Sequence, residues 1–183
     1  MTAEPGRVSI PNRNDPDIPS PVRGHLGWLA AVRRYIGFVV PANLIWEAAQ
    51  IPLYTLWSEG TSGEIVFAIV HCTGGDALIA IASLTAALLM LGNERWPNER
   101  FFPVAAGALV AGLAYTIFNE WLNTEVRGSW AYAEAMPVLP WIGSGFAPLA
   151  QWIAIPAVGF WWARRPMNAN PRATDARDRE RGG

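Results

Sequence analysis

The chain has 183 residues, enough for one domain, but its composition is not that of a soluble protein. Apolar residues make up 51% of it and charged residues only 16%, whereas an ordinary soluble domain is about 25% charged. All 14 basic residues are arginine, which excludes a P-loop, a pyridoxal Schiff base and a retinal Schiff base, since each needs a lysine. The single cysteine, Cys72, excludes an internal disulfide, and a net charge of −1 gives no indication of nucleic acid binding.

Both ends of the chain have the composition of polar tails. Residues 1–24 are rich in proline and lack helical periodicity, and residues 166–183 are rich in Arg, Asp, Asn and Pro. Both are predicted to be disordered. Residues 25–34 follow the first tail and carry Leu26, Leu29 and Val32 at three-residue steps. They predict either a short interfacial helix or the first turns of a longer span.

Four apolar segments follow, at residues 35–57, 65–91, 101–122 and 141–162. Each reaches the roughly 20 residues that a helix needs to cross about 30 Å of hydrocarbon. A backbone facing lipid must satisfy its own hydrogen bonds, so segments of this length are predicted to be helices, with kinks at their prolines. Residues 25–165 are therefore predicted to form an all-α, polytopic membrane domain, a four-helix transmembrane bundle.

Arginine placement orients the predicted spans. The flanks at both termini and the link between the second and third spans carry eight arginines: Arg23, Arg33, Arg34, Arg95, Arg100, Arg164, Arg165 and Arg172. The other two links share only Arg127. Because cytoplasmic loops carry the excess of basic residues, both termini are predicted to be cytoplasmic. Eight of the ten tryptophans fall at the predicted membrane boundaries, where aromatic belts form. The expected location is the bacterial inner (cytoplasmic) membrane, with the lipid bilayer as partner.

Four ionisable residues lie within the predicted spans: Glu47, His71, Asp76 and Glu120. Such a residue at a helix centre costs about 2.5 to 3.5 kcal/mol on insertion scales. At about 1.5 Å of rise per residue, Glu120 lies roughly 3 Å below the outer boundary and His71 about 9 Å, while Glu47 and Asp76 lie about 15 to 17 Å deep. Because all four fall in the outer half, we expect them to converge on one outward-facing polar cavity that binds a ligand or proton.

Helical spacing adds supporting polar residues to this set. Asn43, Glu47 and Gln50 follow an i, i+4, i+7 pattern, Thr116, Glu120 and Asn123 repeat it, and Tyr54 and Gln151 extend the polar surface. A structural alternative is open for Asn43 and Gln151, since buried amides often join membrane helices at about 0.6 kcal/mol per hydrogen bond. Glu120 could equally keep its carboxylate in interfacial water.

The spacing of His71 and Asp76 does not put them on one face of a helix. His71 and Asp76 are five residues apart, or about 140° around an ideal helix. They would share a face only if Gly74 and Gly75 opened the helix between them.

The third link, residues 123–140, holds Trp130, Tyr132, Met136 and two prolines around only three charges. So much apolar surface is unusual in a free loop. The link is predicted to fold back and cover the mouth of the bundle, the alternative being a simple interfacial anchor.

Seven short strings resemble a family of small four-span bacterial inner-membrane proteins without an established activity. They are Trp46-Glu47, Pro52-Leu53-Tyr54, the six residues from His71 to Asp76, Glu120-Trp121, Trp130-Ala131-Tyr132, Met136-Pro137 and Gln151-Trp152. The resemblance covers residues 43–156 and implies the four-span architecture, but no mechanism.

Three functions are compatible with these features. The first is a protein that binds a cation, proton or small polar ligand, with Glu47, His71 and Asp76 as candidate ligands for a divalent metal. The sequence has no di-iron, zinc-protease or bis-histidine haem pattern, and no nucleotide or pyridoxal signature. The second is a membrane enzyme acting on a lipid or isoprenoid-like substrate, with the same residues as general acid and base. The third is a structural subunit of a membrane complex, with another membrane protein or a second copy as partner.

Overall fold

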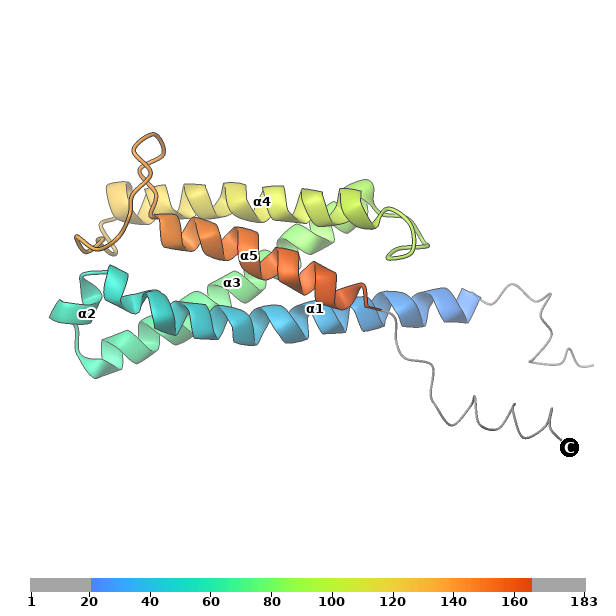
Figure 1. Ribbon diagram of the computed structural model, residues 1–183, viewed down its shortest axis with the longest axis horizontal. Coiled ribbons are helices and arrows are strands. Elements are labelled where there is room, and N and C mark those ends of the chain that lie inside the picture. The colour runs from blue at the N-terminus through green and yellow to red at the C-terminus, as the bar shows by residue number, and fades with distance from the viewer. Residues whose placement is uncertain (1–20, 166–183) are drawn as a thin grey trace, which may run out of the picture.

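The computed structural model describes residues 21–165, and their side chains from residue 27 onward (Figure 1). This part of the chain is helical throughout, apart from links and isolated bridges. Its long helices are α1 (Pro21–Gln50), α3 (Ser62–Leu91), α4 (Phe101–Trp121) and α5 (Phe146–Ala163). Its short elements are a 3-10 turn (Ile51–Leu53), α2 (Leu56–Glu59) and a π-helical turn (Leu122–Val126).

Four helical segments of the described chain are long and apolar enough to cross a membrane: Gly27–Leu53, Ser62–Leu91, Phe101–Val126 and Phe146–Ala163. The prediction of an all-α, four-helix transmembrane fold is therefore confirmed, and the chain is a multi-pass membrane protein. The expected disordered segments lie almost wholly outside the described residues, at 1–20 and 166–183.

The first and last spans have other bounds than predicted. Helix α1 begins at Pro21, so residues 25–34 are the first turns of a long helix rather than a separate interfacial helix, and residues 21–24 are not part of a tail. The same helix ends at Gln50 instead of continuing to Trp57. Pro52 explains the early end, because it has no N–H to donate and its ring disfavours a helical residue before it. Helix α5 begins at Phe146, not at Trp141.

Helix α3 begins with a capping box. The Thr61 hydroxyl accepts a hydrogen bond from the Glu64 backbone N–H, while the Glu64 side chain accepts from the Thr61 backbone N–H at 2.8 Å. Without these bonds the backbone N–H groups of Thr61 and Glu64 would lack a hydrogen-bond partner at the start of the helix. From there α3 runs without interruption to Leu91, through Gly74 and Gly75.

Each long helix packs against two others: α1 and α4 both contact α3 and α5. The described chain starts and finishes at one end of the bundle, beside the α3–α4 link, and this is the termini end (Figure 1). The opposite end, with α2 and residues 127–145, is the loop end.

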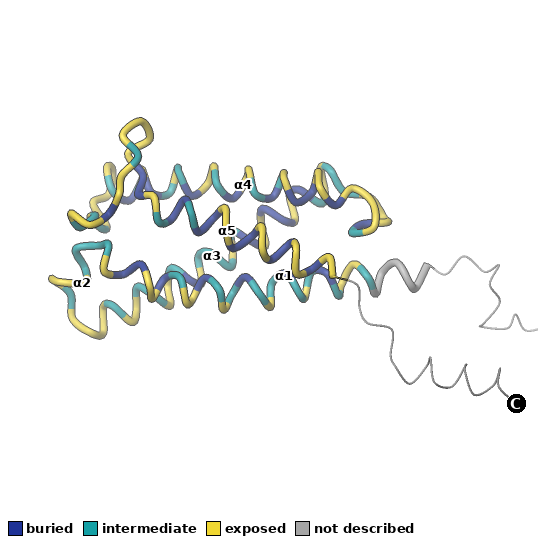
Figure 2. The backbone as a smooth tube through the Cα atoms, viewed as in Figure 1, coloured by how far each residue is buried: buried dark blue, intermediate teal, exposed yellow. Residues whose placement is uncertain are grey.

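Buried residues recur every three or four positions along the helices (Figure 2). Their chemistry changes from one end of the bundle to the other. On α1 the buried series is Ala31, Tyr35 and Val39, followed by Asn43, Glu47 and Gln50. On α4 it is Val104, Ala108 and Gly112, followed by Thr116 and Glu120. The core is therefore apolar at the termini end and polar at the loop end.

Candidate functional site

Gln151 on α5 is the centre of the polar core. It is 2% exposed, and its Nε2 atom donates to Asn43 Oδ1 at 2.9 Å, Glu47 Oε1 at 2.9 Å and Asp76 Oδ2 at 2.8 Å. These contacts join α5 to both α1 and α3. Because a primary amide has only two N–H groups, three oxygens compete for two hydrogens.

Gln50 completes this group from the last turn of α1. Its Nε2 atom donates to Glu47 Oε1 at 2.8 Å and lies 3.3 Å from Gln151 Oε1. Its own Oε1 accepts a hydrogen bond from the indole N–H of Trp46 at 3.2 Å. We call Asn43, Glu47, Gln50, Asp76 and Gln151 the carboxylate cluster.

The carboxylate cluster contains two acidic groups and no basic one. Glu47 is buried, and Asp76, at the middle of α3, is half-buried. Within the described residues the only ion pair is Arg95–Glu99, at 2.9 Å, on the exposed α3–α4 link. The hydrogen bonds that Glu47 and Asp76 receive from side chains in the cluster come from neutral amides. Between residues 21 and 165, no arginine forms an ion pair with either carboxyl group.

Glu120 forms a separate site nearer the loop end. This carboxylate is 5% exposed and accepts a hydrogen bond from the phenol of Tyr132, which belongs to the α4–α5 link. The Tyr132 oxygen in turn accepts from the Gly145 backbone N–H at 2.9 Å. We call Glu120 and Tyr132 the capped acid.

The supporting residues on α4 do not bond the carboxylate cluster. The Thr116 hydroxyl donates to Gly112 O at 3.0 Å, and the Asn123 amide donates to Asn119 O at 2.8 Å. Both bonds therefore stay within their own helical segment.

The α4–α5 link folds onto the segment after α1, as the sequence predicted. Thr55 N donates to Ala131 O and Ala133 N donates to Leu53 O, both at 3.0 Å. Between these bonds the Tyr54 and Tyr132 rings lie 5.6 Å apart, centroid to centroid. The link thus covers the loop end of the bundle above Glu120.

The same contacts change the chemistry of the two phenols. Burial first, and then the charge of Glu120, raises the pKa of Tyr54 above its ordinary value of 10.0. Burial and the hydrogen bond to Glu120 raise the pKa of Tyr132 as well. Both tyrosines therefore keep their protons at neutral pH and can act as neutral donors and acceptors.

His71 does not join the site, contrary to the expectation that it converges with the acids. It is exposed, and its ring stacks on Phe67 with centroids 5.3 Å apart. Helix α3 is continuous at Gly74 and Gly75, so the 140° separation from Asp76 is retained. Glu47, His71 and Asp76 are thus not a joint metal site, and no group of three His, Cys, Asp or Glu residues suited to a metal occurs between residues 21 and 165.

Two further expectations need correction. The acids were expected in an open cavity, but Glu47 and Gln151 bond each other directly in a closed cluster and are 6% and 2% exposed. The depth of Glu47 was counted along a helix to Trp57, whereas α1 ends at Gln50, so Glu47 lies within one turn of the helix end.

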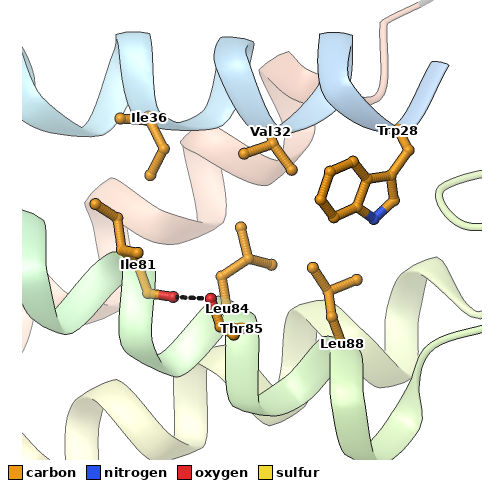
Figure 3. Close-up of a pocket in the computed structure, with 7 residues that line it drawn as sticks. All are labelled: Trp28, Val32, Ile36, Ile81, Leu84, Thr85 and Leu88. Atoms are coloured by element: carbon orange, nitrogen blue, oxygen red, sulfur yellow. Dashed lines mark hydrogen bonds between the residues drawn. The ribbon is translucent and has the colours of Figure 1, made fainter. Parts of the chain in front are cut away.

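A pocket of about 70 Å³ lies elsewhere, between α1 and α3 (Figure 3). It is lined by Trp28, Val32, Ile36, Ile81, Leu84, Thr85 and Leu88. Its one hydroxyl, of Thr85, already donates to Ile81 O at 2.7 Å. This apolar gap holds no acidic group and is not part of the candidate site.

Tyr132 is the site residue that helical spacing could not identify. It lies in an irregular link, so no periodicity relates it to Glu120, twelve residues earlier. The available signal was the aromatic and apolar composition of the link, which indicated a packed cap but not its hydrogen-bond partner.

Comparison with models of protein families, with curated proteins and with solved structures finds no match to this chain. The resemblance to small four-span inner-membrane proteins therefore rests only on the short strings that suggested it.

Proposed function

We propose that this protein binds a proton within the membrane, shared between the carboxyl groups of Glu47 and Asp76. The observation that carries the proposal is that both groups bond one nitrogen, Gln151 Nε2, at 2.9 and 2.8 Å. Two carboxyl oxygens that contact the same atom lie close together, on helices that approach from different sides.

Electrostatics favour a bound positive charge at this point. Two like charges in a low-dielectric interior repel strongly, and neutral amides do not cancel their charge. A proton between the two carboxyl groups removes one negative charge and supplies a hydrogen bond. Such a pair titrates as one unit, which suits proton uptake and release.

A proton fits the donor set better than a divalent metal does. Calcium takes six to eight oxygen ligands, and magnesium a near-ideal octahedron of oxygens. In the carboxylate cluster, Glu47 Oε1 instead receives N–H groups from both Gln50 and Gln151. An oxygen that already accepts two hydrogen bonds is a poor ligand for a metal ion.

We also propose that the protein lies in a bacterial inner membrane with the termini end in the cytoplasm. The described arginines at that end are Arg33, Arg34, Arg95, Arg100, Arg164 and Arg165. Near the loop end, Arg127 is accompanied by Glu59, Glu64, Glu125 and Glu134. This charge difference follows the positive-inside tendency, and it supports an orientation with the carboxylate cluster nearer the periplasmic side.

Infrared spectroscopy of the protein in lipid vesicles tests the proton site. We expect a protonated carboxylic acid band at neutral pH that disappears in both Glu47→Gln and Asp76→Asn, because each substitution removes half of the shared site. Glu125→Gln, an exposed glutamate near the loop end, is the matched control and should leave the band intact. A band that is missing from the wild type, or that keeps its full wild-type intensity in both variants, would rule out the shared proton.

A further inference from the structure

We propose that the capped acid, Glu120 with Tyr132, is a second proton site through which protons reach the carboxylate cluster from the loop end. This inference rests on the proposed function, since it assigns the entrance to the same proton site. Three features support it: the position of Glu120, the contacts of Tyr132, and a second phenol, Tyr54, on which the charges of both acidic sites act.

Glu120 lies where an entrance is needed. It is the penultimate residue of α4, at the loop end, whereas Asp76 is at the middle of α3. Its carboxylate is buried, and its described side-chain hydrogen bond comes from Tyr132. Among the described residues no side-chain hydrogen bond joins Glu120 to the carboxylate cluster, so Glu120 can take up and release a proton without breaking the hydrogen bonds of that cluster.

Tyr132 connects Glu120 to the outer surface of the cap. The residue is half-buried, and Gly145 N holds its oxygen at 2.9 Å. The groups that face the capped acid from the packed elements are Tyr54 after α1, Glu47 on α1, Cys72 on α3 and Glu125 in the π-helical turn. None of these is a cation, so among the described residues no fixed positive charge faces the capped acid.

Tyr54 is the phenol beside Tyr132 on which the charges of both acidic sites act. Its ring centroid is 5.6 Å from that of Tyr132, and the charges of both Glu120 and Glu47 act on its phenol. Because a protonated phenol both donates and accepts hydrogen bonds, the Tyr54 oxygen can accept the proton from the Glu120 carboxyl group while its own proton goes to Glu47. The phenol ends neutral, and Glu120, now a carboxylate, takes its next proton from the loop end. The proton is neither created nor consumed along this route.

Hydrogen–deuterium exchange of the carboxylic acid band of Glu47 and Asp76 tests the route. After transfer into deuterated buffer, the band should shift in the wild type and shift about tenfold more slowly, or slower still, in Glu120→Gln and Tyr132→Phe. Both replacements are close in shape to the native residues. Tyr115→Phe, an exposed tyrosine on α4, is the matched control and should exchange at the wild-type rate.

Whether the exchange rate falls or rises in the variants distinguishes a proton entrance from a cap that only covers the bundle. If the cap only shields the bundle, Tyr132→Phe loosens it and the band exchanges faster. A faster or unchanged rate in both variants would overturn the inference while leaving the shared proton site in place. Absence of the band from the wild type would instead contradict the proposed function itself.

Discussion

Gln151 determines what kind of site the polar core can be. A single neutral amide contacts Asn43 and both carboxyl groups, so three helices meet at one side chain. An arginine at this position would neutralise one carboxylate permanently and fix the charge of the site. A glutamine provides the hydrogen bonds but leaves the charge open to change when a proton binds.

The close approach of α4 to α5 beside this site depends on Gly112. A Cβ atom there would lie 2.5 and 2.6 Å from two ring carbons of Trp152, which is 3% exposed and has no space to retreat. We expect Gly112→Ala to lower the free energy of unfolding by about 1–3 kcal/mol. Gly74→Ala is the control: its Cβ would meet nothing within 4 Å, so stability should stay equal or rise slightly. Reversible unfolding in mixed micelles measures both, and equal stability of the two variants would contradict the packing argument.

At the scale of an element, the α4–α5 link is a folded cap that should respond to high pH. The folded state raises the pKa of Tyr132 above 10.0, so its protonated form is favoured by folding. The stabilisation is therefore complete below the ordinary phenol pKa and is lost as the pH rises through the folded value. The measurement is the ultraviolet absorbance spectrum of the folded wild type minus that of folded Tyr132→Phe. Between about pH 10 and 11 this difference spectrum should show no phenolate absorbance from Tyr132. In denaturant the same difference spectrum should titrate at about pH 10. A native Tyr132 that ionises at the ordinary pH would refute the buried contact with Glu120.

Features on regular helices could be predicted from the sequence, whereas features on irregular backbone could not. The stripe of Asn43, Glu47 and Gln50 followed from helical spacing, because i, i+4 and i+7 share a face in any α-helix. The same geometry argued against His71, and the continuous α3 keeps that residue outside. The end of α1 and the partner of Glu120 were not predictable by spacing. Both depend on irregular backbone, after Pro52 and around Tyr132, where no period relates one residue to the next.

For the whole molecule, two asymmetries point in the same direction. The core is apolar at the termini end, around Trp96 and the Tyr35–Phe160 stack with centroids 4.4 Å apart, and polar at the loop end. Charge is divided likewise, with arginines gathered at the termini end. Arg34 and Arg165 meet there, the former donating to the backbone oxygen of the latter at 2.5 Å. An apolar half on the basic side would seal the membrane behind the proposed proton site, so that protons reach it from the loop end.

Topology is the consequence that can be measured. Fusions after Gly60 and Gly128, both near the loop end, should activate a reporter that works only in the periplasm. Fusions after Asn93, in the α3–α4 link, and at the C-terminus should activate a cytoplasmic reporter. We expect these signals because arginine is in excess at the termini end, and segments next to a span that are rich in arginine tend to stay in the cytoplasm. Replacing Arg127 by Gln is the control, because this lone arginine opposes the expected orientation and its loss should leave all four signals unchanged. A periplasmic C-terminus would reverse the orientation and place the capped acid on the cytoplasmic side, so the proposed entrance would then face the cell interior.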